Sequence, residues 1–157
     1  MKQKNSSIRN QKCMKLAAYE FTPPIAKGKT MTRINVVPVE ELTGKHLVAE
    51  YRELPRVFAL AHKAIDRNWM DGQPLDYKLG SGHVYFFYDK LKYLSDRHQQ
   101  LVAEMIKRGY HPQMTESLEA QWRDKIPEIH WKTYTPTENA LRLNRERIAD
   151  RPGTKEA

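Results

Sequence analysis

Apolar residues recur at helical spacing along much of the chain, and the spacing predicts the main elements of the fold. The first stripe follows steps of four and three: Leu47, Tyr51, Leu54, Phe58, Ala61 and Ile65. The second stripe is the longest: Val84, Phe87, Leu91, Leu94, His98, Leu101 and Met105. Such steps put the side chains on one face of a helix. Gly109 follows the second stripe and suits the position just after a helix end.

A third helix is indicated by start signals near the C-terminus. In TPTENALRLNRERIAD, Thr135 suits the residue before the helix, Pro136 suits its first position, and Glu138 completes a capping box. No segment alternates as a strand would, and no internal repeat occurs. We therefore expect an all-α fold, a single compact domain of three main helices. The connecting loops exceed the usual length, which suggests that they have a function.

Composition divides the chain unevenly. Residues 1–30 are polar, show no sustained period, and hold seven Lys or Arg and one acid, a net charge of +6 out of +8. Residues 31–157 carry the remaining +2. We expect residues 1–30 to be a disordered extension or a start assigned too far upstream, residues 31–152 to be the domain, and residues 153–157 to be a flexible tail. Nucleic-acid binding by the domain must then depend on where its charges lie.

Several classes of protein are disfavoured by the sequence. A single cysteine, Cys13, fits a reducing cytoplasm, and no apolar run approaches the roughly 20 residues that span a membrane. Phosphate-loop, dinucleotide-binding, HExxH and CxxC motifs are missing, and the six histidines are scattered. We therefore expect a cytoplasmic protein without a metal or cofactor. His98 lies on the apolar stripe and is interpreted as a core or boundary histidine with its hydrogen bonds satisfied.

Charged residues crowd one segment, HLVAEYRELPRVF. Arg52, Glu53 and Arg56 lie together there, with His46 two turns earlier. Their spacing alone favours a solvated helix face on which Glu53 and Arg56 pair. Packing is likewise the simpler reading of the aromatic residues in GHVYFFYDKL. Solvation is the simpler reading of the basic residues on the last helix, Arg142, Arg145 and Arg147.

Several segments in order carry a resemblance that spacing cannot supply: MTRIN, HLVAEYRELPRVF, GHVYFFYDKL, EMIKRGY and RIADRP. Together they resemble the pyrimidine-dimer DNA glycosylase family, the phage-type endonuclease V, from Met31 to about Pro152. The resemblance implies an all-α, monomeric repair enzyme that needs no cofactor. It implies a glycosylase with abasic-site lyase activity on ultraviolet-induced pyrimidine dimers in duplex DNA.

The same resemblance assigns roles to individual residues. Removal of Met31 would expose the α-amine of Thr32, the family's nucleophile, which forms an imine with the damaged sugar before β-elimination. An α-amine has a pKa of about 7.7–8.0, so a useful neutral fraction exists at neutral pH. Glu53 matches the catalytic carboxylate. The positions that match DNA-binding or site-lining residues of the family are Arg33, His46, Arg52, Arg56 and Arg147.

Two features depart from the family pattern. As numbered, Thr32 is internal, and an amide nitrogen cannot form an imine, so we favour a true start at Met31. The chain also ends in RPGTKEA without the family's aromatic tail, and WKTYTP at residues 131–136 is the other aromatic surface available. The alternatives are a non-catalytic damaged-DNA-binding protein whose Thr32 amine is capped by the extension, a removable propeptide, and a purely structural helical module.

Overall fold

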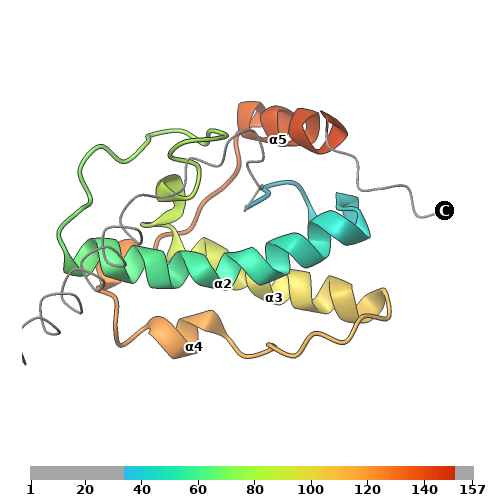
Figure 1. Cartoon of the computed structure of the whole chain (residues 1–157), viewed down its shortest axis with the longest axis horizontal. Helices are drawn as coiled ribbons and strands as arrows, with labels where there is room; N and C mark the ends of the chain where they lie inside the picture. Colours follow the sequence, from blue (N-terminus) through green and yellow to red (C-terminus); the bar gives the residue numbers. More distant parts are fainter. Residues whose placement is uncertain (1–33, 151–157) are drawn as a thin grey trace, which may run out of the picture. The chain divides into compact units, whose positions relative to one another are not determined.

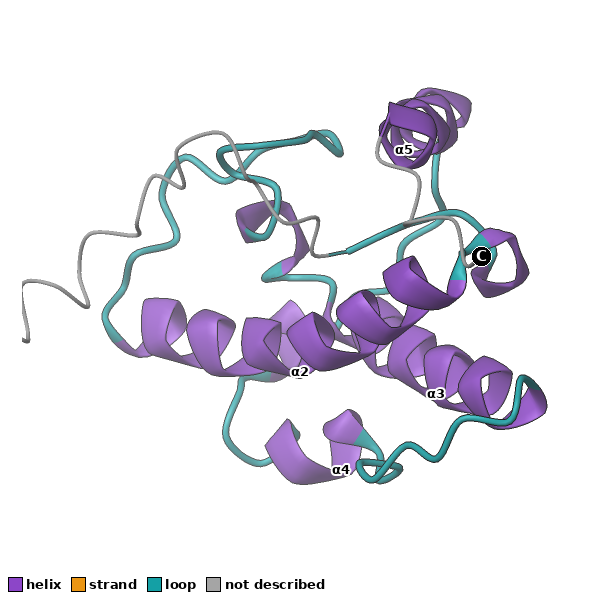
Figure 2. Ribbon diagram, turned by 45° about the vertical axis from the view of Figure 1, so that its right-hand side comes forward, coloured by secondary structure: helices purple, strands orange, loops and turns teal. Residues whose placement is uncertain are grey.

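The described part of the chain, residues 34–150 of the computed structural model, is built from helices (Figures 1 and 2). Its α-helices are α2 (Gly44–Asp66), α3 (Leu91–Lys107), α4 (Leu118–Trp122) and α5 (Glu138–Asp150), and its 3-10 turns are η1 (Val39–Glu41), η2 (Tyr85–Phe87) and η3 (Glu128–His130). Within these residues no strand forms, and Lys90 and Trp131 make an isolated bridge. The predicted all-α class is confirmed. The expected extension 1–30 and tail 153–157 lie outside the described residues.

Helix α2 is the first predicted helix. Thr43 caps it, since its Oγ1 accepts a hydrogen bond from the His46 N–H at 3.3 Å. The helix continues through Pro55 to Asp66. Its buried face holds the apolar stripe residues Leu47, Leu54 and Phe58, but it also buries the carboxylate of Glu50.

Helix α3 is shorter at its start than the apolar stripe predicts. It begins at Leu91, so Val84 and Phe87 do not belong to it. Val84 lies directly before η2 and Phe87 is its last residue. The Phe87 N–H donates to the Val84 carbonyl three residues earlier. At the other end Gly109 has a φ of 88°, and the N–H of Tyr110 reaches back to the Met105 carbonyl at 2.9 Å. This is the predicted glycine stop, in the form of a Schellman motif.

Helix α5 begins two residues later than its sequence signals suggest. Thr137, not Thr135, is the cap, because Thr137 Oγ1 accepts the Ala140 N–H at 3.1 Å. The residue directly before the helix can satisfy an N–H of the first turn with its side chain. Thr137 holds that position, whereas Thr135 lies two residues earlier. Leu141 and Ile148 are partly buried against the core. The residues that α5 buries completely are Ala140 and a polar one, Asn144.

The core lies between α2 and α3, which pack along one another, and α4 contacts both. Figures 1 and 2 place α4 on one side of this pair and the long α2–η2 connection on the other. Phe86 and Phe87 are fully buried, which confirms packing for these two aromatics of GHVYFFYDKL, whereas Tyr85 and Tyr88 are half-buried. Trp131 packs on Phe58, and Tyr134 packs on Phe86. No helix in residues 34–150 has the length and apolar character that crossing a membrane requires.

Candidate active site

The segment Ile34–Val37 is buried and forms neither helix nor strand, and side chains from distant elements bind its backbone. Asn144 of α5 supplies one anchor: its Oδ1 accepts the N–H groups of Val36 and Val37 at 2.7 and 3.1 Å. Its Nδ2 donates to Asn35 Oδ1 at 2.8 Å. A single amide side chain therefore satisfies two backbone donors that have no strand partner, and it attaches α5 to the rest of the domain.

Glu50 and Arg97 supply the second anchor. Glu50 accepts the Asn35 backbone N–H at 3.2 Å and the Asn35 side-chain amide at 3.0 Å. The guanidinium of Arg97 binds both carboxylate oxygens, at 2.9 and 3.1 Å, and also donates to the Val37 carbonyl. Burial opposes the charge of Arg97, but the Glu50 carboxylate outweighs it and raises the pKa of Arg97. The guanidinium is therefore held charged inside the protein.

Tyr77 and His83 supply the third anchor, at Ile34. The Ile34 N–H donates to His83 Nε2 at 3.1 Å, and the Tyr77 hydroxyl donates to the Ile34 carbonyl at 3.3 Å. Because Nε2 accepts, the hydrogen of the neutral ring is on Nδ1, which lies 2.7 Å from the Lys78 carbonyl. Burial raises the pKa of Tyr77, so it remains a hydroxyl donor. We call Glu50, Tyr77, His83, Arg97 and Asn144 the N-terminal clamp.

Glu53 lies one helical turn beyond Glu50. Its side chain is 22% exposed, and Oε1 is 3.2 Å from Nη1 of Arg56, whose side chain is 72% exposed. This is the pair that the spacing predicts. Arg52 is exposed beside them. His46 is half-buried and precedes Glu53 by seven residues, so it shares the same side of α2 at about 100° per residue.

The remaining predicted site residues are distributed differently. Arg147 is half-buried on α5, one turn after the clamp residue Asn144, and therefore belongs to another helix than Glu53. Arg142 pairs with Glu146, and Arg145 binds the carboxylate of Glu41, so both are engaged within the protein. Thr32 and Arg33 lie outside the described residues.

Basic residues extend along α2 from one end to the other. At about 100° per residue, they fall within a sector of about 60° and span about 33 Å. We call this set the basic stripe: Lys45, Arg52, Arg56, Lys63 and Arg67. Glu53 adjoins the stripe, and none of the acidic residues of α2 falls inside its sector. A rod of positive charge of this length suits the phosphates of a DNA duplex.

The sequence analysis did not predict the N-terminal clamp, although the sequence positions of Glu50 and Arg97 gave some indication of it. Glu50 lies at helical spacing between Leu47 and Leu54, so a carboxylate had to be buried on the core face of α2. A buried carboxylate requires a partner. Arg97 similarly lies beside His98 on a helix whose apolar face is buried. Nothing in the spacing indicated Asn144.

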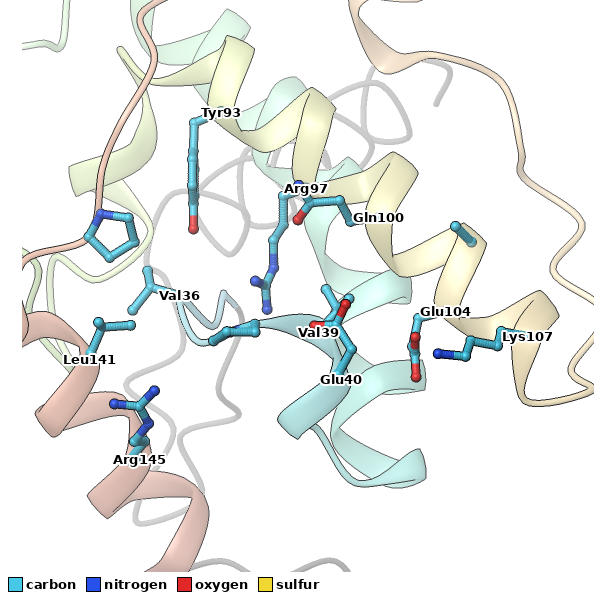
Figure 3. Close-up of a pocket in the computed structure, with 13 residues that line it drawn as sticks. Val36, Val39, Glu40, Tyr93, Arg97, Gln100, Glu104, Lys107, Leu141 and Arg145 are labelled. Atoms are coloured by element: carbon cyan, nitrogen blue, oxygen red, sulfur yellow. The ribbon is translucent and has the colours of Figure 1, made fainter.

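A cavity of about 730 Å³ lies elsewhere, between α3, η1 and α5 (Figure 3). It is lined by Val36, Pro38, Val39, Glu40, Tyr93, Arg97, Gln100, Ala103, Glu104, Lys107, Pro136, Leu141 and Arg145. Among the predicted site residues that the structure describes, none lines it. The cavity therefore lies apart from Glu53, with Arg97 as the residue common to the cavity and the clamp. Residues 34–150 contain no group of histidine, cysteine, aspartate and glutamate side chains arranged to hold a metal ion.

Comparison with known families agrees with this arrangement. Residues 31–118 match the family model described as pyrimidine dimer DNA glycosylase. The chain belongs to this family. The resemblance noted in the sequence is confirmed, and the protein is a DNA repair glycosylase for pyrimidine dimers, with DNA as its substrate. The matched residues begin at Met31 and include Glu50, Glu53 and Arg97, whereas Asn144 and Arg147 of α5 lie beyond them.

Proposed function

We propose that the protein couples base removal to strand cleavage, acting as a glycosylase with abasic-site lyase activity through the α-amine of Thr32. One observation carries this proposal: the N-terminal clamp fixes Asn35 on Glu50, one turn before Glu53. The rise from Glu50 to Glu53 is about 4.5 Å, and three extended residues reach up to about 10 Å. The chain from Asn35 back to Thr32 is thus long enough to bring an amine to the Glu53 carboxylate.

The chemistry needs an amine and a carboxylate together. The neutral amine attacks C1′ of the damaged nucleotide, and the bond to the base breaks with its electrons leaving on the base. Glu53 stabilises the positive charge that develops on the sugar. Opening of the ring transfers a proton to O4′ and leaves an imine between nitrogen and C1′. Removal of a C2′ proton then expels the 3′ phosphate and cuts the strand.

The ion pair between Glu53 and Arg56 suits this chemistry. Arg56 lies against the Glu53 carboxylate in the free protein, and its exposed guanidinium can turn to a phosphate when DNA binds. Such an exchange leaves Glu53 available to the sugar at the moment the substrate arrives. Arg56 then serves DNA binding together with Arg52, and Arg33, His46 and Arg147 are the further contacts that we propose.

The mechanism also requires a free amine on Thr32. The peptide bond between Met31 and Thr32 must therefore be absent from the active form. The start of the family match at Met31 supports Met31 as the true start. We propose that this form acts as a monomer on duplex DNA in the cytoplasm, without a metal or cofactor.

A comparison of two chains tests the proposal. A chain that begins at Met31, with the methionine removed in the host, and the chain of 157 residues are incubated with ultraviolet-irradiated duplex DNA and borohydride. The processed chain is expected to nick the DNA and to give a covalent adduct, which peptide mass analysis locates at Thr32. A form of the short chain with one glycine before Thr32 is the matched control, because it moves the amine by one residue.

Two outcomes would decide against the proposal. A correctly processed chain that binds irradiated DNA but yields neither nick nor adduct would contradict the lyase mechanism. Mass analysis of protein from its native host that finds Thr32 blocked or extended would instead favour the non-catalytic DNA-binding alternative.

A further inference from the structure

The long connection between α2 and η2 carries an unusually exposed leucine. Leu75 is 94% exposed, whereas the next most exposed large apolar side chain in residues 34–150 is Ile129 at 68%. A single exposed apolar side chain is ordinary on a protein surface. Leu75 needs an explanation only if the backbone around it is fixed.

Hydrogen bonds fix the loop before Leu75. Nε2 of Gln73 lies 3.1 and 3.2 Å from the carbonyls of Tyr85 and Phe86 and 2.9 Å from Asp89 Oδ1. Further back in the loop, the Tyr85 hydroxyl is 2.8 Å from the Asp71 carbonyl. Side chains anchored to η2 therefore hold the loop on the N-terminal side of Leu75.

Packing fixes the residues that flank Leu75. Pro74 restricts its own backbone and contacts Gly82, where an added Cβ would come within 3.2 Å of the proline ring. Gly82 also has a φ of 84°, a backbone conformation that favours glycine. Glycine therefore suits this position both for its conformation and for the close approach of Pro74. On the other side Tyr77 is only 4% exposed. Leu75 thus projects from a loop that is anchored on both sides.

The position of Leu75 connects it to the clamp. Two residues later, Tyr77 donates its hydroxyl hydrogen to the Ile34 carbonyl. The loop that presents Leu75 therefore also holds the segment that leads to Thr32. In Figure 1 this connection lies on the side of the α2–α3 pair away from α4.

We propose that Leu75 is a wedge that enters the base stack at the damaged step and holds one nucleotide of that step out of the duplex, an inference that rests on the proposed function. Leucine is among the side chains that DNA-bending proteins insert between base steps. A damaged step stacks poorly, so opening it costs less there than elsewhere. The neighbouring Asp76 repels phosphates, so the loop tip is unsuited to follow the backbone, which the basic stripe does.

Fluorescence of 2-aminopurine tests the wedge. The base is placed opposite a thymine dimer in a duplex, and the full chain is added at saturating concentration so that a change in affinity does not affect the signal. Unstacking by the wild type is expected to raise the fluorescence, and Leu75→Ala is expected to remove most of that rise. Leu75→Met, which keeps an apolar side chain of similar length, is expected to preserve most of it.

A matched control removes another exposed apolar side chain. Ile106 is 58% exposed and follows Arg97 by nine residues, so it lies on the opposite face of α3 from the clamp at about 100° per residue. Ile106→Ala should leave the fluorescence rise unchanged. A full rise with Leu75→Ala would overturn the wedge even if the processed protein nicks DNA. A lack of nicking by processed protein, with the fluorescence dependent on Leu75, would contradict only the proposed lyase mechanism.

Discussion

Glu50 and Arg97 form a fully buried, two-pronged ion pair that joins α2 to α3, with Nε–Oε1 and Nη2–Oε2 distances of 2.9 and 3.1 Å. Glu50 also binds Asn35, and Arg97 also binds the Val37 carbonyl, so the pair is completed by the segment it holds. This link makes the position of the N-terminal segment depend on the core of the domain.

Loss of the Glu50 charge should therefore be costly. Glu50→Gln leaves the Arg97 guanidinium buried without a counter-charge, and we expect the free energy of unfolding to fall by about 3–5 kcal/mol. Urea denaturation measures this value. Glu53→Gln, on the same helix but partly exposed, is the control and should cost no more than about 1 kcal/mol. Equal stability of the two variants would show that the buried pair is not a main support of the fold.

Loss of Asn144 should loosen the clamp without touching α2. Asn144→Ala leaves the N–H groups of Val36 and Val37 without their acceptor, and each unsatisfied group costs about 1–3 kcal/mol. We expect lower stability and a lower kcat for strand cleavage, with less change in DNA affinity. Asn139→Ala on the exposed face of α5 is the control and should change stability by no more than about 0.5 kcal/mol. Unchanged kcat in Asn144→Ala would separate the clamp from catalysis.

Glu53 should matter for chemistry more than for folding. Glu53→Gln removes the charge that stabilises the sugar cation and assists proton transfer, and we expect single-turnover cleavage to slow by about 10²–10⁴. Asp66→Asn is the matched control, because it removes an exposed carboxylate from the far end of the same helix, and it should cleave at nearly the wild-type rate. A Glu53→Gln protein that cleaves normally would remove Glu53 from the mechanism.

The salt dependence of DNA binding should report the basic stripe. Removing a side chain that contacts a phosphate reduces the slope of log K against log salt by about 0.9. We expect this reduction from Arg52→Ala and from Arg56→Ala, measured by fluorescence anisotropy between low and moderate salt. Lys92→Ala on α3 is the control, because Lys92 is paired with Asp96 and Glu119. Slopes that match the wild type would place DNA on another face.

His98 should make the domain less stable in mild acid. It is fully buried and stacked on Tyr51 at 5.6 Å, and neither ring nitrogen has a hydrogen-bond partner among the described residues. The prediction that the hydrogen bonds of His98 are satisfied is therefore wrong. Burial lowers the pKa of His98 below its ordinary 6.5, so the unfolded chain binds a proton more readily than the folded one. The stability that the folded state gains from keeping His98 neutral is fully present above pH 6.5 and is lost as the pH falls below that value.

Comparison of His98→Phe with the wild type isolates the effect of His98 on the pH dependence of stability. His98→Phe keeps an aromatic ring against Tyr51 and removes the titrating group, so its stability should fall less than that of the wild type between neutral and mildly acid pH. Denaturant unfolding at a series of pH values measures this difference. His111→Phe, at an exposed histidine, should retain the wild-type pH dependence. Parallel curves for His98→Phe and wild type would contradict the assignment.

The sequence by itself determined the three main helices, the glycine stop after α3, the pairing of Glu53 with Arg56, and the family, whereas the short helix α4 was not predicted. These features are local: helical spacing, caps and i,i+3 pairs involve residues a few positions apart, and family motifs are read directly along the chain. The errors at the starts of α3 and α5 are also local. They arose because Val84 and Thr135 fit a helical pattern, while the backbone formed η2 and chose Thr137 as the cap.

Only the tertiary structure decided how the N-terminal segment is held. Asn144 and Asn35 are 109 residues apart, and Arg97 and Glu50 are 47 apart, so no period connects them. Their contacts arise because a buried backbone that belongs to no helix or strand must find its hydrogen bonds elsewhere. The fold supplied those partners from helices and a long loop, and thereby set the position from which the chain leads to Thr32.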